Sequence, residues 1–322
     1  MKLTAVLPNY NHADYLPHAL DALLSQTRPA DELIVIDDAS TDNSVTIIED
    51  YVRRYPHIRF VRNADNLGIA RNMNRGLEMA TGDVVYFAAA DDITYRSLFE
   101  TGMALLESHP GAALFSARCE IIDRNGQVTE SLPTPTPLSG PGFIGPDRAI
   151  KELLRDDGWF VGGTTLYRRA PLIAAGGFSP ELGAFCDGYV SRLLALKHGA
   201  CYAPAVLCGW RRMEGGFAWS QAINLNAMMD VIRIAEGKMQ DTDGVFPPDY
   251  IYRWKARHVF GARRFALIQA RRKAVSERGP VGSFFAVCKE TLATIWLFCR
   301  LRPWDWLTVV RRRWRAHRLC CL

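Results

Sequence analysis

The 322-residue sequence has no apolar run long enough to cross a bilayer. A spanning helix needs about 18 consecutive apolar residues, whereas the longest runs here cover only residues 84–90 and 291–299. A polytopic membrane protein is therefore excluded. The apolar stretch Leu3–Leu7 is also too short for a signal peptide. We therefore expect the chain to begin at Met1 in the cytoplasm.

Cysteine motifs are also missing. The eight cysteines form no Cys-x-x-Cys, and the histidines do not cluster with them, so neither a disulfide framework nor a zinc site is predicted. The composition, 48% hydrophobic and 23% charged, excludes disordered and low-complexity proteins. A chain of this length predicts about two structural units with a substantial core.

Charge is distributed unevenly along the chain. Residues 1–250 carry 22 Lys and Arg against 31 Asp and Glu, a net −9, whereas residues 251–322 carry 17 against 3, a net +14. Tryptophan and phenylalanine among arginines are typical of a helix that lies on a membrane surface. We therefore expect this tail to hold the protein peripherally on the anionic inner face of the cytoplasmic membrane. The alternative is a helical hairpin that packs its aromatics on the rest of the chain. No nucleic-acid-binding module accompanies the charge, so nucleic acid is not an expected partner.

The first hundred residues alternate apolar strand-like runs with amphipathic helical periodicity. The strand-like runs cover residues 3–7, 33–37, 58–61 and 84–88. Near-continuous apolar strands separated by helices predict an α/β fold with a mostly parallel sheet and helices on both faces. Ligands bind beyond the carboxyl ends of the strands in such sheets. We expect this domain to span residues 1–225, followed by a helical cationic region at 226–322.

Later segments are less regular. Residues 131–146 contain five prolines and three glycines, which predicts a mobile loop without regular structure that lies over the active site. The other elements that we expect are helices near 95–109, 147–155 and 189–198, strands near 112–119, 160–167 and 201–207, and helix alone from about residue 219.

Two predicted strands end in adjacent acids, Asp37-Asp38 and Asp91-Asp92. Like charges repel unless a cation or hydrogen-bond donors face them, and Mg²⁺ or Mn²⁺ with substrate phosphates would satisfy such a pair. No Gly-x-Gly-x-x-Gly follows a predicted strand, and Gly-x-x-x-x-Gly-Lys-[Ser/Thr] is absent, so neither of these phosphate-binding motifs explains the sheet. The alternative is that the acids belong to polar turns, and we interpret Ser40 and Asp42 as caps of the helix that follows.

These acids belong to a set of motifs whose order and spacing are those of a known family. The set comprises Leu7-Pro8-Asn9-Tyr10-Asn11, Ser25-Gln26-Thr27, Glu32–Asp38 with Ser40 and Asp42, Asn66-Leu67-Gly68, Gly82-Asp83 and Asp91-Asp92. With them, residues 1–220 resemble a family 2 glycosyltransferase of the GT-A fold. The resemblance implies a nucleotide-sugar donor, with binding positions at Pro8, Asn9, Tyr10, Asp38, Arg71 and Ala90. Within that set, Asp38 would contact the nucleobase.

The metal motif departs from the family pattern. Its usual Asp-x-Asp falls on Ala89, Ala90 and Asp91, so the first acid is missing. The resemblance implies that Asp91 ligates Mn²⁺ or Mg²⁺, with Asp92 beside it.

Two later motifs complete the expected site. The segment Gly176–Leu182, followed by Cys186-Asp187, resembles the family segment that carries the catalytic base. The family usually has a Glu-Asp pair there; Cys186 replaces the Glu, so Asp187 is the residue that matches. One carboxylate suffices for an inverting transfer; the alternative is that Asp187 caps a helix. Arg211 and Arg212 resemble the segment that stabilises the leaving diphosphate, although one of them fits a solvated surface position.

We conclude that the sequence predicts an inverting transferase that moves one sugar, from a UDP-sugar, to a saccharide or lipid-linked acceptor in bacterial surface polysaccharide or lipopolysaccharide assembly. The Gln-x-x-Arg-Trp signature of processive synthases is absent. Two alternatives stay open. A sugar-nucleotide pyrophosphorylase would need a glycine-rich basic loop, which residues 8–14 do not offer. A catalytically inactive glycan-binding or scaffold protein would be consistent with Ala89.

Overall fold

The computed structural model describes residues 1–131, 134–212, 223–270 and 272. The chain divides into two compact units, Met1–Arg212 and Met213–Leu322.

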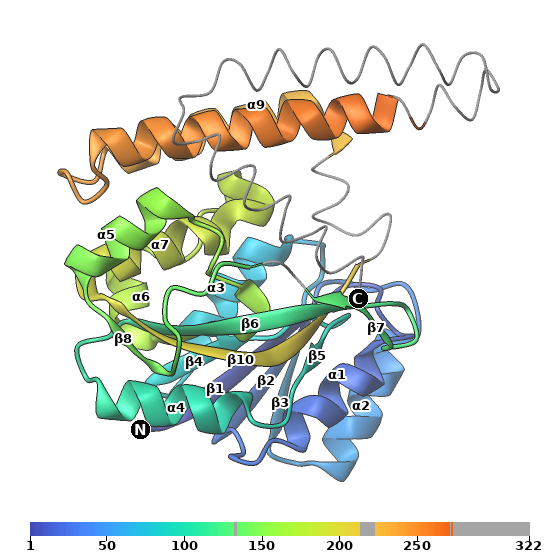
Figure 1. Cartoon of the computed structure of the whole chain (residues 1–322). Helices are drawn as coiled ribbons and strands as arrows, with labels where there is room; N and C mark the ends of the chain where they lie inside the picture. Colours follow the sequence, from blue (N-terminus) through green and yellow to red (C-terminus); the bar gives the residue numbers. More distant parts are fainter. Residues whose placement is uncertain (132–133, 213–222, 271, 273–322) are drawn as a thin grey trace. The chain divides into compact units, whose positions relative to one another are not determined.

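The first unit is built on a central sheet whose N-terminal half is parallel (Figure 1). Strand β1 (Leu3–Asn9) lies between β2 (Glu32–Asp37) and β4 (Val84–Phe87), and β3 (Ile58–Arg62) lies outside β2. Each of these three pairings is parallel. The predicted parallel arrangement is confirmed here, because strands buried on both faces need continuous apolar runs.

The second half of the sheet is mixed. Strand β9 (Leu166–Arg168) runs antiparallel between β4 and β6 (Leu114–Ile122). Strand β10 (Ala200–Arg211) is parallel to β6 and carries β5 (Ile93–Thr94) beyond it. Strand β7 (Val128–Ser131) forms the hairpin on β6 that Asn125-Gly126 indicates.

Two sequence predictions are wrong in this half. The strand expected over residues 160–167 is instead a 3₁₀ turn, η1 (Gly162–Thr164), followed by the short β9. The segment 131–146, expected to lack regular structure, contains β8 (Gly142–Ile144). That strand forms because three residues free of proline pair with the edge of β10. Residues 132–133 of the segment lie outside the described residues.

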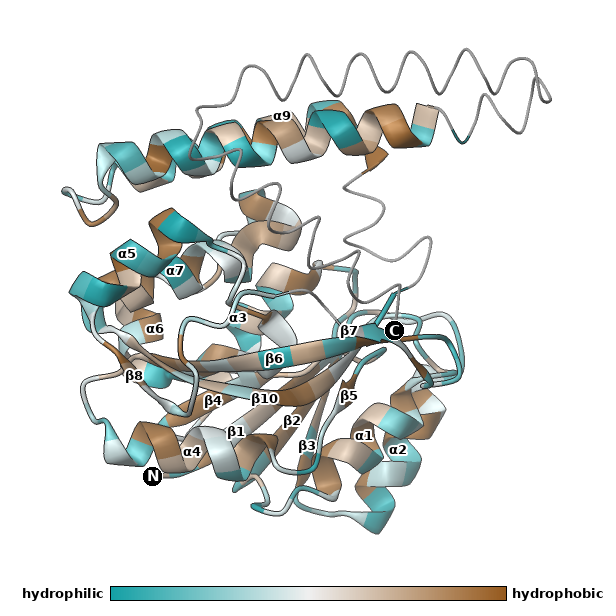
Figure 2. Cartoon of the chain, viewed as in Figure 1, coloured by the Kyte–Doolittle hydropathy of each residue, from teal (hydrophilic) through white to brown (hydrophobic). Residues whose placement is uncertain are grey.

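Helices cover both faces of this sheet, as predicted. Because successive side chains of a strand point to opposite faces, Leu3, Ala5 and Leu7 join one core with α1 (Leu16–Leu24), α2 (Ser44–Arg54) and α4 (Leu98–Ser108). Val6 faces the other side, where α3 (Ile69–Met79) approaches so closely that a Cβ on Gly76 would overlap the Val6 side chain. Figure 2 shows the hydrophobic colouring of the central strands. The remaining helices of the unit are α5 (Pro146–Arg155), α6 (Arg169–Ala174), the 3₁₀ segment η2 (Pro180–Phe185) and α7 (Cys186–His198).

The predicted caps of α2 are wrong, because the N-cap is Asn43. The Asp42 carboxylate still accepts the Ser44 N–H of the first turn at 2.9 Å. The Ser40 hydroxyl accepts from Asn9 Nδ2 at 3.2 Å and from the Asn11 N–H at 3.0 Å instead. Ser40 therefore ties the end of β1 to the end of β2.

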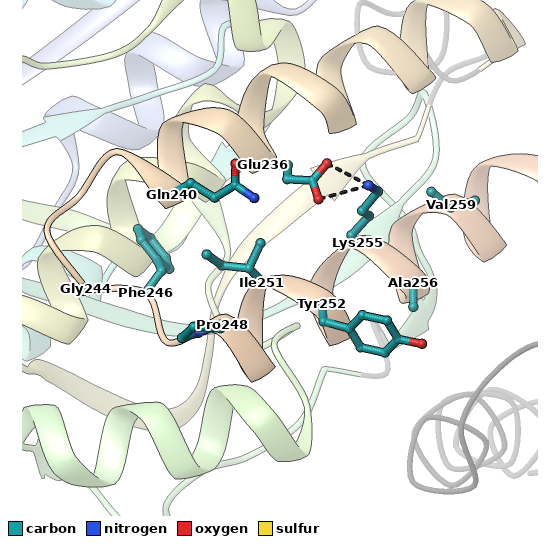
Figure 3. Close-up of a pocket in the computed structure, with 10 residues that line it drawn as sticks. All are labelled: Glu236, Gln240, Gly244, Phe246, Pro248, Ile251, Tyr252, Lys255, Ala256 and Val259. Atoms are coloured by element: carbon teal, nitrogen blue, oxygen red, sulfur yellow. Dashed lines mark hydrogen bonds and ion pairs between the residues drawn. The ribbon is translucent and has the colours of Figure 1, made fainter.

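Among its described residues, the second unit contains two helical segments, α9 (Leu225–Gln240) and residues 248–270. Lys255 Nζ lies 2.9 and 2.8 Å from the two Glu236 oxygens (Figure 3). The turn at 241–247 connects the two segments, and this ion pair links them side by side. Beside it lies a hollow of about 600 Å³ whose lining is largely apolar, with Phe246, Pro248, Ile251 and Tyr252.

Within the described part of the chain, no helix has the length and apolar character that a membrane span requires. Most of the cationic tail falls on residues 273–322, so the prediction for it lies outside the described residues.

Candidate functional site

The expected site lies where the strand order reverses. From β1 the chain adds β2 and then β3 on one side, whereas β4 pairs with β1 on the other side. In open α/β sheets, ligands bind at the carboxyl ends of the strands beside such a switch point. Pro8 and Asn9 end β1, Asp37 ends β2 and Asp38 follows it, and Ala90 to Asp92 follow β4. The structure therefore brings the predicted donor and metal segments to one edge of the sheet.

Asn9 belongs to a buried hydrogen-bond network at the end of β1. Its side-chain amide donates to Asp37 Oδ1 at 3.0 Å and to Ser40 Oγ at 3.2 Å. Its main-chain carbonyl accepts the Asp38 N–H at 2.8 Å. Asn9 and Asp37 are 2% and 0% exposed, so their side chains hold the loops together and face away from solvent. The adjacent Tyr10 is 43% exposed, which leaves an aromatic ring at the edge of the site.

Asp38 is held by donors from the protein itself. Oδ1 accepts from Asn63 Nδ2 at 2.7 Å and from the Leu67 N–H at 2.8 Å, and Oδ2 accepts from the Gly68 N–H at 2.9 Å. Burial raises the pKa of Asp38, but hydrogen bonds from Asn72, Leu67, Asn63 and Gly68 outweigh it, and the pKa lies below its ordinary value. Asp38 is thus an ionised anchor for the 63–68 loop, and its contact with a nucleobase stays a prediction.

Asp91 and Asp92 form a turn after β4 with unequal surroundings. Asp92 Oδ1 accepts the Arg211 N–H at 2.8 Å. Burial and the neighbouring charge of Asp91 hold the pKa of Asp92 well above its usual range, and Arg211 opposes this rise. The Asp91 carboxylate, in contrast, accepts no hydrogen bond from the described residues, and Asp91 engages Arg211 only through its carbonyl. Asp91 is therefore the acid of the pair that is available to a ligand.

The two arginines at the end of β10 have different surroundings. Arg211 is 3% exposed and donates from Nε to the Asp91 carbonyl at 2.6 Å and from Nη1 to the Asp123 carbonyl. Its guanidinium also lies 4.7 Å from the centre of the Tyr15 ring. Arg212 is half exposed and pairs with Glu130 at 2.5 Å. Arg211 thus braces the Asp91–Asp92 turn, and Arg212 occupies the surface position that the sequence left open for one of the two.

Two other predicted donor residues flank the same edge. Ala90 is 2% exposed. Arg71 is exposed on α3, and its Nη1 donates to the Leu67 carbonyl at 3.2 Å. Arg71 therefore lies next to the loop that Asp38 anchors.

Asp187 lies in the first turn of α7 and is half-buried. Oδ1 accepts the Gly188 N–H at 2.6 Å. Arg192, one turn later, donates to the Gly188 carbonyl and to the Asp157 carbonyl, each at 2.6 Å. Burial raises the pKa of Asp187, and the Gly188 N–H and the Arg192 charge offset only part of that rise. A carboxylate with a raised pKa has the property that a general base requires.

The turn η1 connects the candidate base with the candidate metal ligands. A Cβ on Gly162 would lie less than 3.0 Å from Asp187 Oδ2, and a Cβ on Gly163 would lie 3.7 Å from Asp92 Oδ2. Because consecutive Cα atoms are 3.8 Å apart, the two carboxylate oxygens are at most about 14 Å apart. The structure therefore brings Asp187 and the Asp91–Asp92 turn to the two sides of one short segment.

Sequence reasoning missed several residues that position this site: Asn63, which holds Asp38; Tyr15, which faces Arg211; and Tyr86, whose hydroxyl donates to the Gly163 carbonyl at 2.9 Å. Only Tyr86 had a signal in the sequence, as a polar tip within a buried strand.

The residues present fit a divalent cation. Among the described residues there is no group of three or more His, Cys, Asp or Glu that could hold a metal ion by itself. Mg²⁺ and Mn²⁺ sites that share substrate phosphates need only one or two carboxylates. Asp91, with its unbonded carboxylate, would hold such an ion, with Asp92 beside it.

The family model for glycosyl transferase family 2 matches residues 4–174, and the chain belongs to this family. YibD of Escherichia coli, described as an uncharacterized glycosyltransferase, is 39% identical over 147 residues, which cover 45% of this chain and 42% of that protein. The chain matches about half or less of the length of the first curated relatives.

Solved structures are similar over most of the chain. TarS 1-349 of Staphylococcus aureus in complex with UDP-GlcNAc has a TM-score of 0.61 at 18% identity, covering 91% of this chain and 82% of that one. The mannosyltransferase PcManGT of Pyrobaculum calidifontis, in complex with GDP-Man and Mn²⁺, has a TM-score of 0.59 at 19% identity. The match covers 98% of this chain and 86% of that one. This likeness shows the fold, which is the GT-A fold expected from the sequence motifs.

The raised pKa of Asp187 predicts a pH-dependent difference in stability between the wild type and Asp187→Asn. A carboxyl whose pKa is higher in the folded than in the unfolded state stabilises the fold when protonated, and this contribution is lost as pH rises through the folded pKa. Asn carries no such charge, so Asp187→Asn should melt at a higher temperature than wild type at pH 7–8, and the gap should shrink toward pH 4. Thermal melts across this pH range measure it, with the exposed Glu49→Gln as control. A gap that is constant with pH would contradict the prediction.

Proposed function

We propose that this protein is an inverting, metal-dependent glycosyltransferase that transfers a single sugar from a nucleotide-sugar, a UDP-sugar, to a saccharide or lipid-linked acceptor. The observation that carries the proposal is the pair of carboxylates on either side of η1: Asp91, whose carboxylate no described residue engages, and Asp187, whose pKa is raised. Surface polysaccharide or lipopolysaccharide assembly is the setting that we propose for it.

The donor would bind at the switch point of the sheet. Pro8 and Tyr10 at the end of β1, with the loop that Asp38 anchors, border the space for the nucleotide. Mn²⁺ or Mg²⁺ bound at Asp91 would neutralise charge on the donor diphosphate. The complexes of TarS with UDP-GlcNAc and of PcManGT with GDP-Man and Mn²⁺ support a nucleotide-sugar and a divalent ion. Arg211 keeps the Asp91–Asp92 turn in place through Nε, and its Nη1 donates to the Asp123 carbonyl, which leaves the Nη2 group for the diphosphate.

Asp187 would act as the general base. Its carboxylate takes the proton of the acceptor hydroxyl as that oxygen bonds to the anomeric carbon, and the bond from that carbon to the diphosphate oxygen breaks. The nucleoside diphosphate leaves with the bonding electrons, and the anomeric configuration inverts. One carboxylate is enough because no covalent intermediate forms.

Membership of the glycosyltransferase family favours this proposal over a sugar-nucleotide pyrophosphorylase. A catalytically inactive scaffold is the remaining alternative, because Ala89 replaces an acid. The donor test separates the two proposals: a panel of nucleotide-sugars is incubated with Mn²⁺ and full-length protein, and hydrolysis and thermal stabilisation are measured. An enzyme releases nucleoside diphosphate, whereas a scaffold does not.

Asp91→Asn should abolish transfer and weaken Mn²⁺-dependent binding of the donor, because the ion would lose its main protein carboxylate. Calorimetric titration of a UDP-sugar with and without Mn²⁺ measures the loss. Arg212→Gln, an exposed change near the same turn, serves as control. Turnover close to wild type in Asp91→Asn would remove Asp91 from the metal site.

Asp187→Asn should lower kcat by about 10² to 10⁴ while donor affinity changes little, because a base acts in the transition state. Steady-state kinetics and donor titration on the same preparation test this. A collapse of donor affinity with unchanged folding would instead make Asp187 a donor-binding or structural residue.

We also propose that the cationic tail holds the enzyme on an anionic membrane, where a lipid-linked acceptor would be found. Residues 251–322 carry a net charge of +14 and the rest of the chain carries −9. This difference supports attachment through the tail, because an anionic surface attracts the tail and repels the rest. Each Lys or Arg at an anionic surface contributes roughly 1 kcal/mol, so replacing Arg311, Arg312 and Arg313 by Gln should weaken binding about a hundredfold.

Flotation of the full chain with vesicles that contain anionic lipid, across a salt series, measures this binding. Arg53→Gln and Arg54→Gln with Arg62→Gln remove three exposed cations from the sheet unit and make a matched control. Equal flotation of both triple variants, or no dependence on anionic lipid, would overturn the membrane role.

A further inference from the structure

Two consecutive glycines, Gly162 and Gly163, begin the η1 turn between the two acids of the site. Neither belongs to the glycines with positive φ among the described residues, which include Gly68, Gly176 and Gly199. Their backbone conformation is therefore open to any L-residue. The reason for glycine at these positions has to be the space around them.

Gly162 leaves the space that the Asp187 carboxylate occupies. A Cβ at this position would overlap Asp187 Oδ2 and lie 3.5 Å from its Cγ. The carboxylate cannot move away without losing a hydrogen bond, because Oδ1 accepts the Gly188 N–H at 2.6 Å at the start of α7. A side chain at position 162 would have to move the carboxylate or the turn.

The turn itself is firmly held. The Tyr86 hydroxyl, on a side chain that is 1% exposed, donates to the Gly163 carbonyl at 2.9 Å. The Thr164 hydroxyl is fully buried, accepts the Ala117 N–H at 2.9 Å, and has the Val161 and Ala117 carbonyls as acceptors for its single proton at 3.0 and 3.1 Å. The turn is thus tied to β4 and β6, and a Cβ at position 162 would displace the carboxylate rather than the backbone.

We propose that Gly162 is a positioning residue for Asp187: its missing side chain admits the Asp187 carboxylate against a turn whose other side borders the Asp91–Asp92 turn. This inference rests on the proposed role of Asp187 as the base. A base has to lie within about 2.6–3.2 Å of the proton that it takes, and a misplacement of about 1 Å can cost 10²-fold in rate. Gly162 thereby sets where the Asp187 carboxylate lies relative to the acceptor hydroxyl.

The test is a double-mutant cycle in the full chain between Gly162→Ala and Asp187→Asn. Gly162→Ala alone should lower kcat by roughly 10- to 100-fold, with donor affinity within about twofold of wild type because the change acts on the base alone. In the Asp187→Asn background, Gly162→Ala should change kcat by less than about twofold, because a residue that acts through Asp187 has nothing left to act on. Gly111→Ala is the control, because a Cβ there meets nothing within 4 Å.

A stability cycle covers the case in which Gly162→Ala is poorly folded. Asp187→Ala removes the overlapping carboxylate, so Gly162→Ala should lower the melting temperature by about 3 °C or more in wild type and by clearly less in Asp187→Ala. Additive effects in both cycles would overturn the positioning role. If Asp187→Asn leaves kcat unchanged while the stability cycle shows coupling, the proposed base is wrong, and the contact between Gly162 and Asp187 stands.

Discussion

Negative charge gathered at one edge of the sheet is the constraint on which this structure depends. Strands β2 and β4 both deliver acids to that edge, and a carboxylate there needs hydrogen-bond donors or a cation. The protein supplies donors to Asp37 and Asp38, and it supplies backbone and side-chain groups of Arg211 to the Asp91–Asp92 turn. The Asp91 carboxylate receives no donor from the described residues. Where the protein gives a carboxylate no hydrogen-bond donor, a bound cation or ligand can supply the missing positive partner.

The same constraint separates residues that look alike in the sequence. Asp38 and Asp91 each belong to a pair of acids after an apolar strand. The 63–68 loop donates hydrogen bonds to the Asp38 carboxylate, whereas the Asp91 carboxylate has no such donors among the described residues. The Asn63 side chain and the Leu67 and Gly68 N–H groups make this difference, and nothing in the local sequence of Asn63 indicates that it faces Asp38. The two arginines are a contrasting case. Along the end of β10, Arg211 points inward and its neighbours Trp210 and Arg212 are exposed, which is the period of two that any strand imposes.

The parallel half of the sheet could be predicted because its strands are long apolar runs with helical periodicity between them. The mixed half could not. Strand β9 has three residues and β8 has three, too few for a periodic pattern to develop. Both exist because a neighbouring strand offers unpaired backbone groups, which is tertiary information. For the same reason, the motifs indicated Asp187 as the base, whereas the role of Gly162 became visible only when Asp187 was placed against it.

The position of β9 has a consequence for how the molecule assembles. It comes late in the first unit and runs between β4 and β6, which precede it by about eighty and fifty residues in the chain. Contacts of such long sequence separation form slowly, because the loop entropy is lost before the contact is gained. Until β9 inserts, β4 and β6 have no strand between them, and η1 has no fixed place beside Asp92. The loops around Asn9 and Asp38 can therefore form from the first hundred residues, whereas the Asp91–Asp92 turn and Asp187 take their final places only after β9 and β10 have joined the sheet.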